Sequence, residues 1–213
     1  MTVVGQQRLA FLEPLPLIAV LRAREPEGAI AQAAVYIHAG LTCLEVTWTT
    51  PEAAAILQHL RQQYPHCTIG AATLRSVPML EAALAAGAQF LVSPHTALDL
   101  VPVAQAAQVP LLLGALTPTE IVQAWQAGAT AVKVFPVMAL GGATYVQMLK
   151  QPFPEIPLVP CGGIPWSEVL PLLKAGAIAI GMGSQLSRGL TPLELKAQVE
   201  QIRQAWQQLA RGF

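Results

Sequence analysis

The fold is indicated by the stretch QAGATAVKVFP at residues 126–136, in which an Ala-Gly pair separates a helical stretch from an apolar strand. Glycine directly after a helix is typical of the left-handed residue that ends helices. A short run of valine and alanine is typical of a strand buried on both faces of a parallel sheet. The pattern recurs as HAGLTCLEVT (38–47), AAGAQFLVSP (85–94) and KAGAIAIGMGS (174–184). The sequence therefore repeats a helix–glycine–strand unit.

Working outward from these four copies, the pattern predicts eight strands that alternate with eight helices. We expect the strands near residues 16–22, 41–48, 68–73, 89–94, 110–116, 131–137, 157–163 and 177–184. We expect the helices near residues 25–39, 51–63, 76–86, 97–107, 118–127, 142–150, 166–175 and 191–210. A further helix near residues 5–12 is expected to cover the bottom of the fold.

Eight β–α units of about 25 residues each fit a minimal (β/α)8 TIM barrel. The alternative is an open doubly wound sheet, which would carry a glycine-rich turn after its first strand. The first strand ends instead in Val20-Leu21-Arg22-Ala23-Arg24, without a GxGxxG pattern. Neither a Gly/Ser linker nor a shift in composition divides the chain. We therefore expect one α/β domain over residues 1–213, a single TIM barrel with an extra N-terminal helix.

The charge content excludes several classes of protein. Only 11% of the 213 residues are charged, 54% are hydrophobic, and 12 basic side chains balance 12 acidic ones. A disordered chain needs low hydrophobicity and high net charge, and a nucleic-acid-binding protein normally carries a basic patch. We expect no nucleic-acid partner. Scarce charge also favours an oligomer that hides apolar surface.

The apolar segments are too short for membrane insertion. A spanning helix needs roughly 18 or more uninterrupted apolar residues, whereas runs such as 109–116 are bounded by polar residues. The chain begins without an apolar core of signal-peptide length. The three cysteines Cys43, Cys67 and Cys161 form no CxxC motif and are typical of buried thiols in a reducing compartment. We expect a cytoplasmic protein without a membrane partner.

Lys133 is the first candidate for chemistry, because it interrupts the apolar strand Ala-Val-Lys-Val-Phe-Pro. Strand side chains alternate between two faces, so Lys133 points into the barrel if Val132 and Val134 face the helices. Burial there would lower the pKa of the lysine and supply a neutral amine for attack on a carbonyl. The alternative is a structural lysine that pairs with a carboxylate.

Glu45 favours the catalytic interpretation of Lys133. It lies in the apolar strand Leu-Glu-Val-Thr at 44–47. The two residues lie on the second and sixth strands, and inward residues of alternate strands share layers in a barrel. A buried Lys–Glu pair is costly as structure alone, yet it provides a nucleophile beside a general acid/base. A purely structural ion pair stays open as the alternative.

Two glycine patches indicate how a phosphate would be bound. Gly162 and Gly163 follow the seventh strand, and Gly183 and Ser184 follow the eighth. The loops after these strands often bind phosphate through backbone N–H groups. In contrast, the sequence has no HxH or HExxH motif and only one aspartate, Asp99. We therefore expect a phosphorylated substrate and neither a metal nor another cofactor.

Seven short motifs follow one another along the chain, namely Leu-Glu-Val-Thr (44–47), Gly-Ala-Ala-Thr (70–73), Ser-Pro (93–94), Val-Lys-Val-Phe-Pro (132–136), Gly-Gly (141–142), Gly-Gly-Ile (162–164) and Gly-x-Gly-Ser (181–184). In this order they resemble the 2-keto-3-deoxy-6-phosphogluconate (KDPG) aldolase family, which includes 4-hydroxy-2-oxoglutarate (KHG) aldolases and phosphogalactonate-cleaving relatives. The resemblance extends roughly from Pro16 to Leu186.

The resemblance implies a metal-free class I aldolase that assembles as a homotrimer. It implies that Lys133 forms a Schiff base with the 2-keto carbon and that Glu45 moves protons. The products would be pyruvate and glyceraldehyde 3-phosphate. The resemblance also assigns substrate-binding roles: Thr73, Pro94 and Phe135 at the keto-acid end, and Gly162, Gly163, Gly183 and Ser184 at the phosphate.

One position departs from the phosphogluconate-type pattern. Those members usually carry an arginine two residues after LEVT that binds the substrate carboxylate, and here Thr49 takes its place. Its position makes Thr49 a further expected substrate-binding residue. A carboxylate normally binds a bidentate arginine, and Arg22 at the end of the first strand is the nearest candidate. The phosphogalactonate-type members are similar in this respect. The alternatives are an aldolase for unphosphorylated 4-hydroxy-2-oxoglutarate and a sugar-phosphate-binding barrel without activity.

Overall fold

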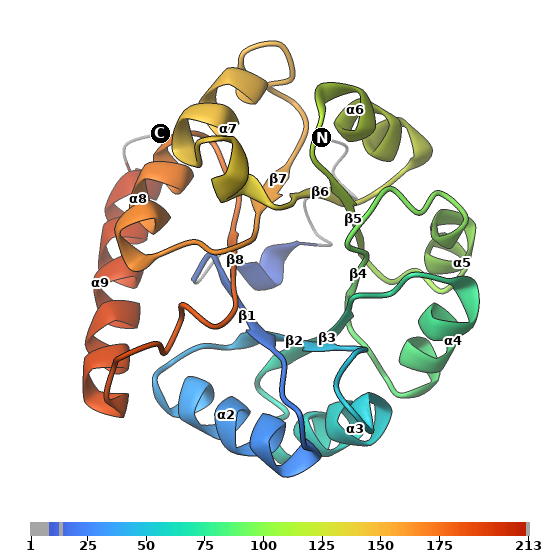
Figure 1. Cartoon of the computed structure of the whole chain (residues 1–213), viewed down its shortest axis with the longest axis vertical. Coiled ribbons are helices and arrows are strands. Elements are labelled where there is room, and N and C mark those ends of the chain that lie inside the picture. Colours follow the sequence, from blue (N-terminus) through green and yellow to red (C-terminus); the bar gives the residue numbers. More distant parts are fainter. Residues whose placement is uncertain (1–8, 13–14, 212–213) are drawn as a thin grey trace.

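Eight parallel strands follow one another around a barrel in the order of the chain (Figure 1). The computed structural model describes residues 9–12 and 15–211. The first seven strands pair in chain order, and the eighth pairs with the first. Between the seventh and eighth strands, an isolated bridge joins Cys161, directly after β7, to Gly181 on β8. The strands are β1 (Leu17–Leu21), β2 (Cys43–Thr47), β3 (Thr68–Ala72), β4 (Leu91–Val92), β5 (Leu111–Ala115), β6 (Ala131–Val134), β7 (Leu158–Pro160) and β8 (Ile180–Met182).

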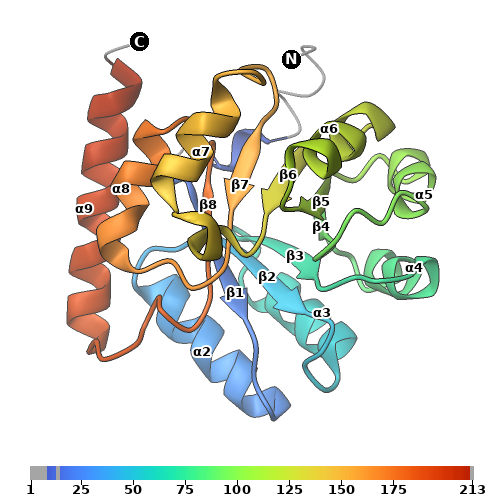
Figure 2. The same cartoon turned by 45° about the horizontal axis from the view of Figure 1, so that its top comes forward.

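Helices surround this barrel, and Figure 2 shows the longest of them, α9, running along the outside next to α8. They are α2 (Pro26–His38), α3 (Ala53–Gln63), α4 (Val77–Ala85), α5 (Leu100–Ala106), α6 (Pro118–Ala127), α7 (Ala143–Lys150), α8 (Trp166–Lys174) and α9 (Pro192–Arg211). The predicted TIM barrel is therefore confirmed, with every expected strand and outer helix in place.

The repeated glycines end their helices as predicted. Gly40, Gly87, Gly128 and Gly176 have φ angles of 99°, 88°, 103° and 101°. Residues other than glycine rarely adopt this left-handed region, so each glycine can reverse the chain from a helix toward the next strand. The motif that indicated the fold therefore acts through the backbone geometry of one residue in each unit.

The strands are shorter than the apolar runs that predicted them. The sixth strand, expected to reach residue 137, ends at Val134. Pro136 follows shortly after and has no N–H group to continue a strand ladder. The chain then forms the 3-10 helix η2 (Val137–Leu140), which the sequence pattern did not predict.

The 3-10 helix η1 (Ala10–Leu12) covers one opening of the barrel, where Figure 1 shows it near the centre. Residues 5–8 of the expected helix lie outside the described residues. Leu9 and Leu12 are buried. They pack with the apolar side chains that point into the barrel, namely Ile18, Cys43, Ala72, Phe90, Val92, Leu112, Ala131, Val159 and Ala179.

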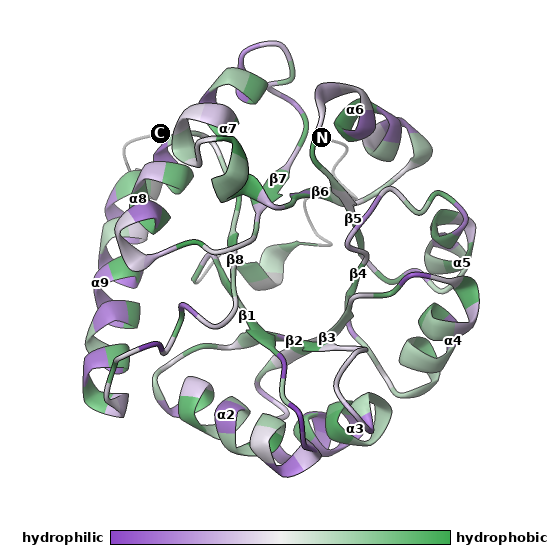
Figure 3. Cartoon of the chain, in the orientation of Figure 1, coloured by the Kyte–Doolittle hydropathy of each residue, from purple (hydrophilic) through white to green (hydrophobic). Residues whose placement is uncertain are grey.

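The outward-facing residues of the strands pack against the helices. Val132 and Val134 belong to this outer core, whereas Ala131 belongs to the inner cluster. Figure 3 shows the corresponding pattern on the helices, whose hydrophobic sides face the strands. The alternation predicted for the sixth strand is thus confirmed, and it places Lys133 on the inner face.

Candidate active site

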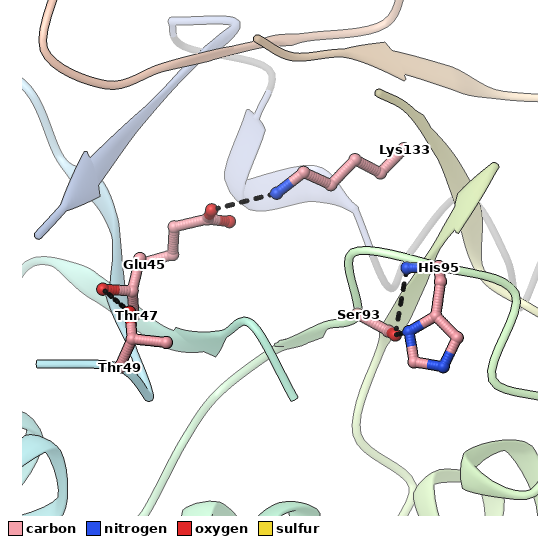
Figure 4. Close-up of polar contacts among 6 residues, drawn as sticks. All are labelled: Glu45, Thr47, Thr49, Ser93, His95 and Lys133. Atoms are coloured by element: carbon pink, nitrogen blue, oxygen red, sulfur yellow. Dashed lines mark hydrogen bonds and ion pairs between the residues drawn. The ribbon is translucent and has the colours of Figure 1, made fainter. Parts of the chain in front are cut away.

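The centre of the candidate site is an ion pair between Lys133 on β6 and Glu45 on β2. Lys133 Nζ lies 3.4 Å from Glu45 Oε1 (Figure 4). The lysine is 8% exposed and the glutamate 2% exposed. Residues 88 positions apart are therefore brought together inside the barrel, as expected for inward-facing residues of the second and sixth strands.

The electrostatics of Lys133 differ from the sequence-based expectation. Burial, the largest influence, lowers the pKa of the ammonium, but the neighbouring Glu45 carboxylate raises it, and the net pKa lies above its ordinary value. The expectation of a lowered pKa was wrong because it considered burial without the partner. A neutral amine at Lys133 therefore requires a proton transfer, and Glu45 is the adjacent acceptor.

Lys133 lies in the wall of a cavity of about 400 Å³ at the carboxyl ends of the strands, here called the barrel-mouth cavity. Eight other residues predicted for the site line the same cavity: Arg22, Thr73, Pro94, Phe135, Gly162, Gly163, Gly183 and Ser184. Glu45 joins them through its contact with Lys133. One cavity is thus lined by an amine, a guanidinium and two glycine loops.

Thr49 lies elsewhere. It lines a second hollow together with Arg22, Ala23, Arg24 and Pro51. Its hydroxyl Oγ1 donates a hydrogen bond to Thr47 Oγ1 at 3.3 Å (Figure 4). Arg22 lines both spaces, and within the described part of the chain it forms no ion pair. Its guanidinium is therefore available to an anion at the edge of the barrel-mouth cavity.

Two lining residues have unusual local geometry. Thr73, directly after β3, has a φ angle of 63°, which is strained for a β-branched residue. Phe135, directly after β6, is 40% exposed, and its ring centroid lies 5.7 Å from Lys133 Nζ. Strain of this kind is often found at functional sites, and here it occurs in the cavity wall.

The structure adds residues that the sequence analysis did not select as site residues. Val20, Gln32, Cys161, Gly181 and Gln185 also line the barrel-mouth cavity. Burial raises the pKa of the Cys161 thiol to about 11, so the thiol stays protonated at neutral pH. A side chain at Gly181 would collide with Cys161 Sγ, because a Cβ atom there would lie 1.9 Å from the sulfur. Gly181 therefore leaves room for Cys161 between the seventh and eighth strands.

His95 lies beside the site on the loop after β4. It is exposed, and its Nδ1 atom lies 3.3 Å from Ser93 Oγ (Figure 4). Nowhere among residues 9–12 and 15–211 do three or more His, Cys, Asp or Glu side chains gather as a candidate metal site.

A known protein family matches this chain over the residues that form the barrel. Positions 10–203 match the sequence model of a family described as KDPG and KHG aldolase. The chain belongs to this family. As a KDPG/KHG aldolase it is a lyase. The matched positions include all eight strands and the residues that line the barrel-mouth cavity.

Two curated aldolases illustrate the range of the family. The chain is 36% identical to a 2-dehydro-3-deoxy-phosphogluconate aldolase from Treponema pallidum over 153 residues, which are 72% of this chain and 73% of that protein. It is 31% identical to a 2-dehydro-3-deoxy-6-phosphogalactonate aldolase from Escherichia coli over 186 residues, which are 86% and 90% of the two chains.

Solved structures agree with the fold of this KDPG/KHG aldolase. A 4-hydroxy-2-oxoglutarate/2-dehydro-3-deoxyphosphogluconate aldolase is 34% identical and superposes with a TM-score of 0.81 over 92% of this chain and 96% of the other. The KDPG aldolase of Legionella pneumophila, which holds pyruvate as a covalent carbinolamine, is 27% identical with a TM-score of 0.79 over 96% and 98% of the chains. No helix in the described part of the present chain combines the length and apolar character needed to cross a membrane.

Proposed function

We propose that this aldolase cleaves 2-keto-3-deoxy-6-phosphogluconate or its galactonate epimer to pyruvate and glyceraldehyde 3-phosphate, through a Schiff base on Lys133. The observation that carries the proposal is the buried Lys133–Glu45 pair, whose lysine lines the barrel-mouth cavity. A buried ion pair is weak evidence for stability, whereas an amine beside a carboxylate is what this chemistry requires. The Legionella relative with its covalent carbinolamine supports the same chemistry.

The reaction begins with a proton transfer, because the pKa of Lys133 is raised and only the neutral amine is a nucleophile. Lys133 Nζ gives a proton to Glu45 Oε1 across 3.4 Å. The amine then attacks the 2-keto carbon, and Glu45 returns the proton to the former keto oxygen, giving a carbinolamine. Loss of water leaves an iminium that can accept an electron pair from the adjacent carbon.

Glu45 then acts as base in the cleavage step. It accepts the proton of the C4 hydroxyl, directly or through a water molecule, while the C3–C4 bond breaks. The aldehyde leaves, and the bonding electron pair moves toward the iminium to form an enamine. Protonation of the enamine carbon and addition of water release pyruvate and free Lys133. Each proton taken by Glu45 is thus returned within the same turnover.

The two ends of the substrate require different partners. We assign the phosphate to the backbone of Gly162, Gly163 and Gly183 with the hydroxyl of Ser184, because these residues form the loops after β7 and β8. Gly163 leaves open space where a Cβ atom would stand, so an anion can approach its backbone closely. The keto-acid end is assigned to Thr73, Pro94 and Phe135, and its carboxylate to Arg22.

The substrate class is tested by comparing three compounds in an assay that couples pyruvate release to lactate dehydrogenase. We expect the two phosphorylated epimers to exceed unphosphorylated 4-hydroxy-2-oxoglutarate in kcat/KM by about 100-fold, the value of one or two charge-assisted hydrogen bonds. Equal turnover of all three would contradict the phosphate role of the glycine loops. Binding of the phosphorylated compounds without release of pyruvate would contradict the aldolase assignment in favour of a binding protein.

Arg22 is expected to determine affinity for the keto acid. Arg22→Gln should raise KM for the substrate by about 10- to 100-fold, because charged hydrogen bonds contribute about 1.5–3 kcal/mol. The matched control is Arg24→Gln, since Arg24 lines only the second hollow. Steady-state kinetics with both variants measures the effect. An equal KM in the two variants would show that Arg22 does not bind the carboxylate.

We also propose that the protein is a cytoplasmic homotrimer. Exposed apolar side chains support association, since Leu140, Met148 and Leu193 are 45%, 62% and 78% exposed. Cys43, Cys67 and Cys161 are free thiols, which fits a reducing compartment. Light scattering coupled to size exclusion measures the assembly state.

A further inference from the structure

Gln32 lines the barrel-mouth cavity and has no role in the mechanism above. Gln32 lies on α2, a helix that otherwise packs against the barrel, yet its side chain forms part of the cavity wall. Arg22, Gly183 and Ser184 line the same cavity, so Gln32 shares it with the loops that follow β1 and β8.

The nitrogen end of the Gln32 amide is held in place. Nε2 donates a hydrogen bond to Tyr36 Oη at 2.9 Å, and Tyr36 Oη lies 3.1 Å from Ser187 Oγ. Burial raises the pKa of the Tyr36 hydroxyl, so it stays protonated and can both accept and donate. Ser187 follows Ser184 on the connection from β8 to α9. This chain of hydrogen bonds therefore joins α2 to the loop assigned to the phosphate.

The oxygen end of the same amide lacks a partner. Among the described residues, Gln32 Oε1 is the one buried side-chain oxygen or nitrogen without a hydrogen bond. Leaving such a group unpaired carries its full desolvation cost, and folded proteins contain few groups of this kind. An amide oxygen only accepts hydrogen bonds, so its missing partner must be a donor.

We propose that Gln32 is a specificity-determining residue whose Oε1 accepts a hydrogen bond from the substrate hydroxyl next to the phosphate-bearing carbon. The inference rests on the proposed function, which places the keto carbon at Lys133 and the phosphate at the loops after β7 and β8. A phosphate dianion has no proton to donate, whereas the adjacent hydroxyl has one. The terminal dihedral of glutamine is broad, so the amide can tilt toward that hydroxyl while Nε2 remains near Tyr36.

The test compares two aldehydes in the reverse reaction, the condensation with pyruvate. Glyceraldehyde 3-phosphate carries the hydroxyl, and 3-oxopropyl phosphate lacks it. The unsubstituted enzyme is expected to prefer the first by about tenfold or more in kcat/KM, the value of one hydrogen bond. In Gln32→Met, which keeps an unbranched side chain, this ratio should fall to near one.

Two further variants separate specificity from structure. Tyr36→Phe releases the amide nitrogen and should lower the ratio in part, because Tyr36 positions Gln32. This variant also tests the inference should Gln32→Met fail to fold. Gln58→Met replaces an exposed glutamine on α3 and should leave the ratio unchanged. A purely structural role of Gln32 would slow both aldehydes by the same factor, and that result would overturn the inference.

Trapping with borohydride distinguishes this inference from the proposed function. Pyruvate alone does not carry the hydroxyl, so the reduced adduct on Lys133 should form in Gln32→Met as in the unsubstituted enzyme. An adduct in both proteins with an unchanged aldehyde ratio overturns the role of Gln32 and leaves the Schiff-base mechanism intact. Absence of the adduct from the unsubstituted enzyme overturns the mechanism itself.

Discussion

Lys133→Met is expected to abolish aldol cleavage, with kcat lower by about 10⁴-fold or more, as for the loss of other covalent nucleophiles. Methionine keeps an unbranched chain of similar size in this buried position but has no amine to form a Schiff base. Pyruvate and borohydride should therefore leave a reduced adduct on the unsubstituted enzyme and none on the variant. Mass spectrometry of the intact protein and of its peptides measures both the adduct and its position.

The loss must be separated from unfolding, because removing one partner of a buried ion pair costs about 3–5 kcal/mol. The double variant Lys133→Met with Glu45→Leu also removes the unpaired carboxylate, and its thermal unfolding should recover toward that of the unsubstituted enzyme. Lys174→Met, at an exposed position on α8, is the matched control and should keep both activity and adduct. An adduct on Lys133→Met, or activity within tenfold of the original, would contradict the assignment.

The position of this lysine could be predicted because it depends only on short-range rules. A strand alternates its side chains with a period of two, so the valines on either side of Lys133 determined which way the lysine points. The glycine after each helix marked the boundaries between units. Glu45 followed from the same alternation together with the layer rule for barrels. These features need no knowledge of distances, and the structure confirms each of them.

The protonation state of Lys133 could not be predicted from the sequence in the same way. The pKa of Lys133 depends on the competition between burial and a carboxylate 3.4 Å away. The sequence indicated both groups but not their separation. Burial alone predicts a lowered pKa, and the pair raises it instead. The sign of an electrostatic effect therefore required the three-dimensional structure even though both residues had been identified.

Residues that reach the cavity from outside the strands were missed for a related reason. Gln32 belongs to an outer helix and Gln185 to the loop after β8. Neither position carries a pattern that distinguishes it from other polar surface residues. Thr49 shows the converse case, since its place in the sequence suggested a substrate-binding residue, whereas it lines the second hollow and not the barrel-mouth cavity.

Glu45→Gln is expected to lower kcat by about 10²- to 10⁴-fold, the usual contribution of a general acid/base. It should also change how adduct formation depends on pH. Burial and the Arg22 charge lower the pKa of Lys133, while Glu45 and Cys161 raise it. Removing the carboxylate takes away the larger of the two raising influences, so the pKa of Lys133 falls. The amine then becomes neutral at a lower pH, and the pH profile of adduct formation should shift to lower pH.

At neutral pH the lower pKa of Lys133 favours adduct formation, whereas the loss of the general acid/base slows turnover. Because these two effects have opposite directions, the test is specific. The fraction of neutral amine rises in Glu45→Gln, while proton transfer during cleavage is lost. Borohydride trapping of pyruvate should therefore be impaired much less than turnover of the phosphorylated substrate. Glu81→Gln, at an exposed position on α4, is the matched control and should reproduce both original profiles. A pH profile of Glu45→Gln that coincides with the original would mean that Glu45 does not hold the proton of Lys133, and the first step of the mechanism would have to be assigned to another group.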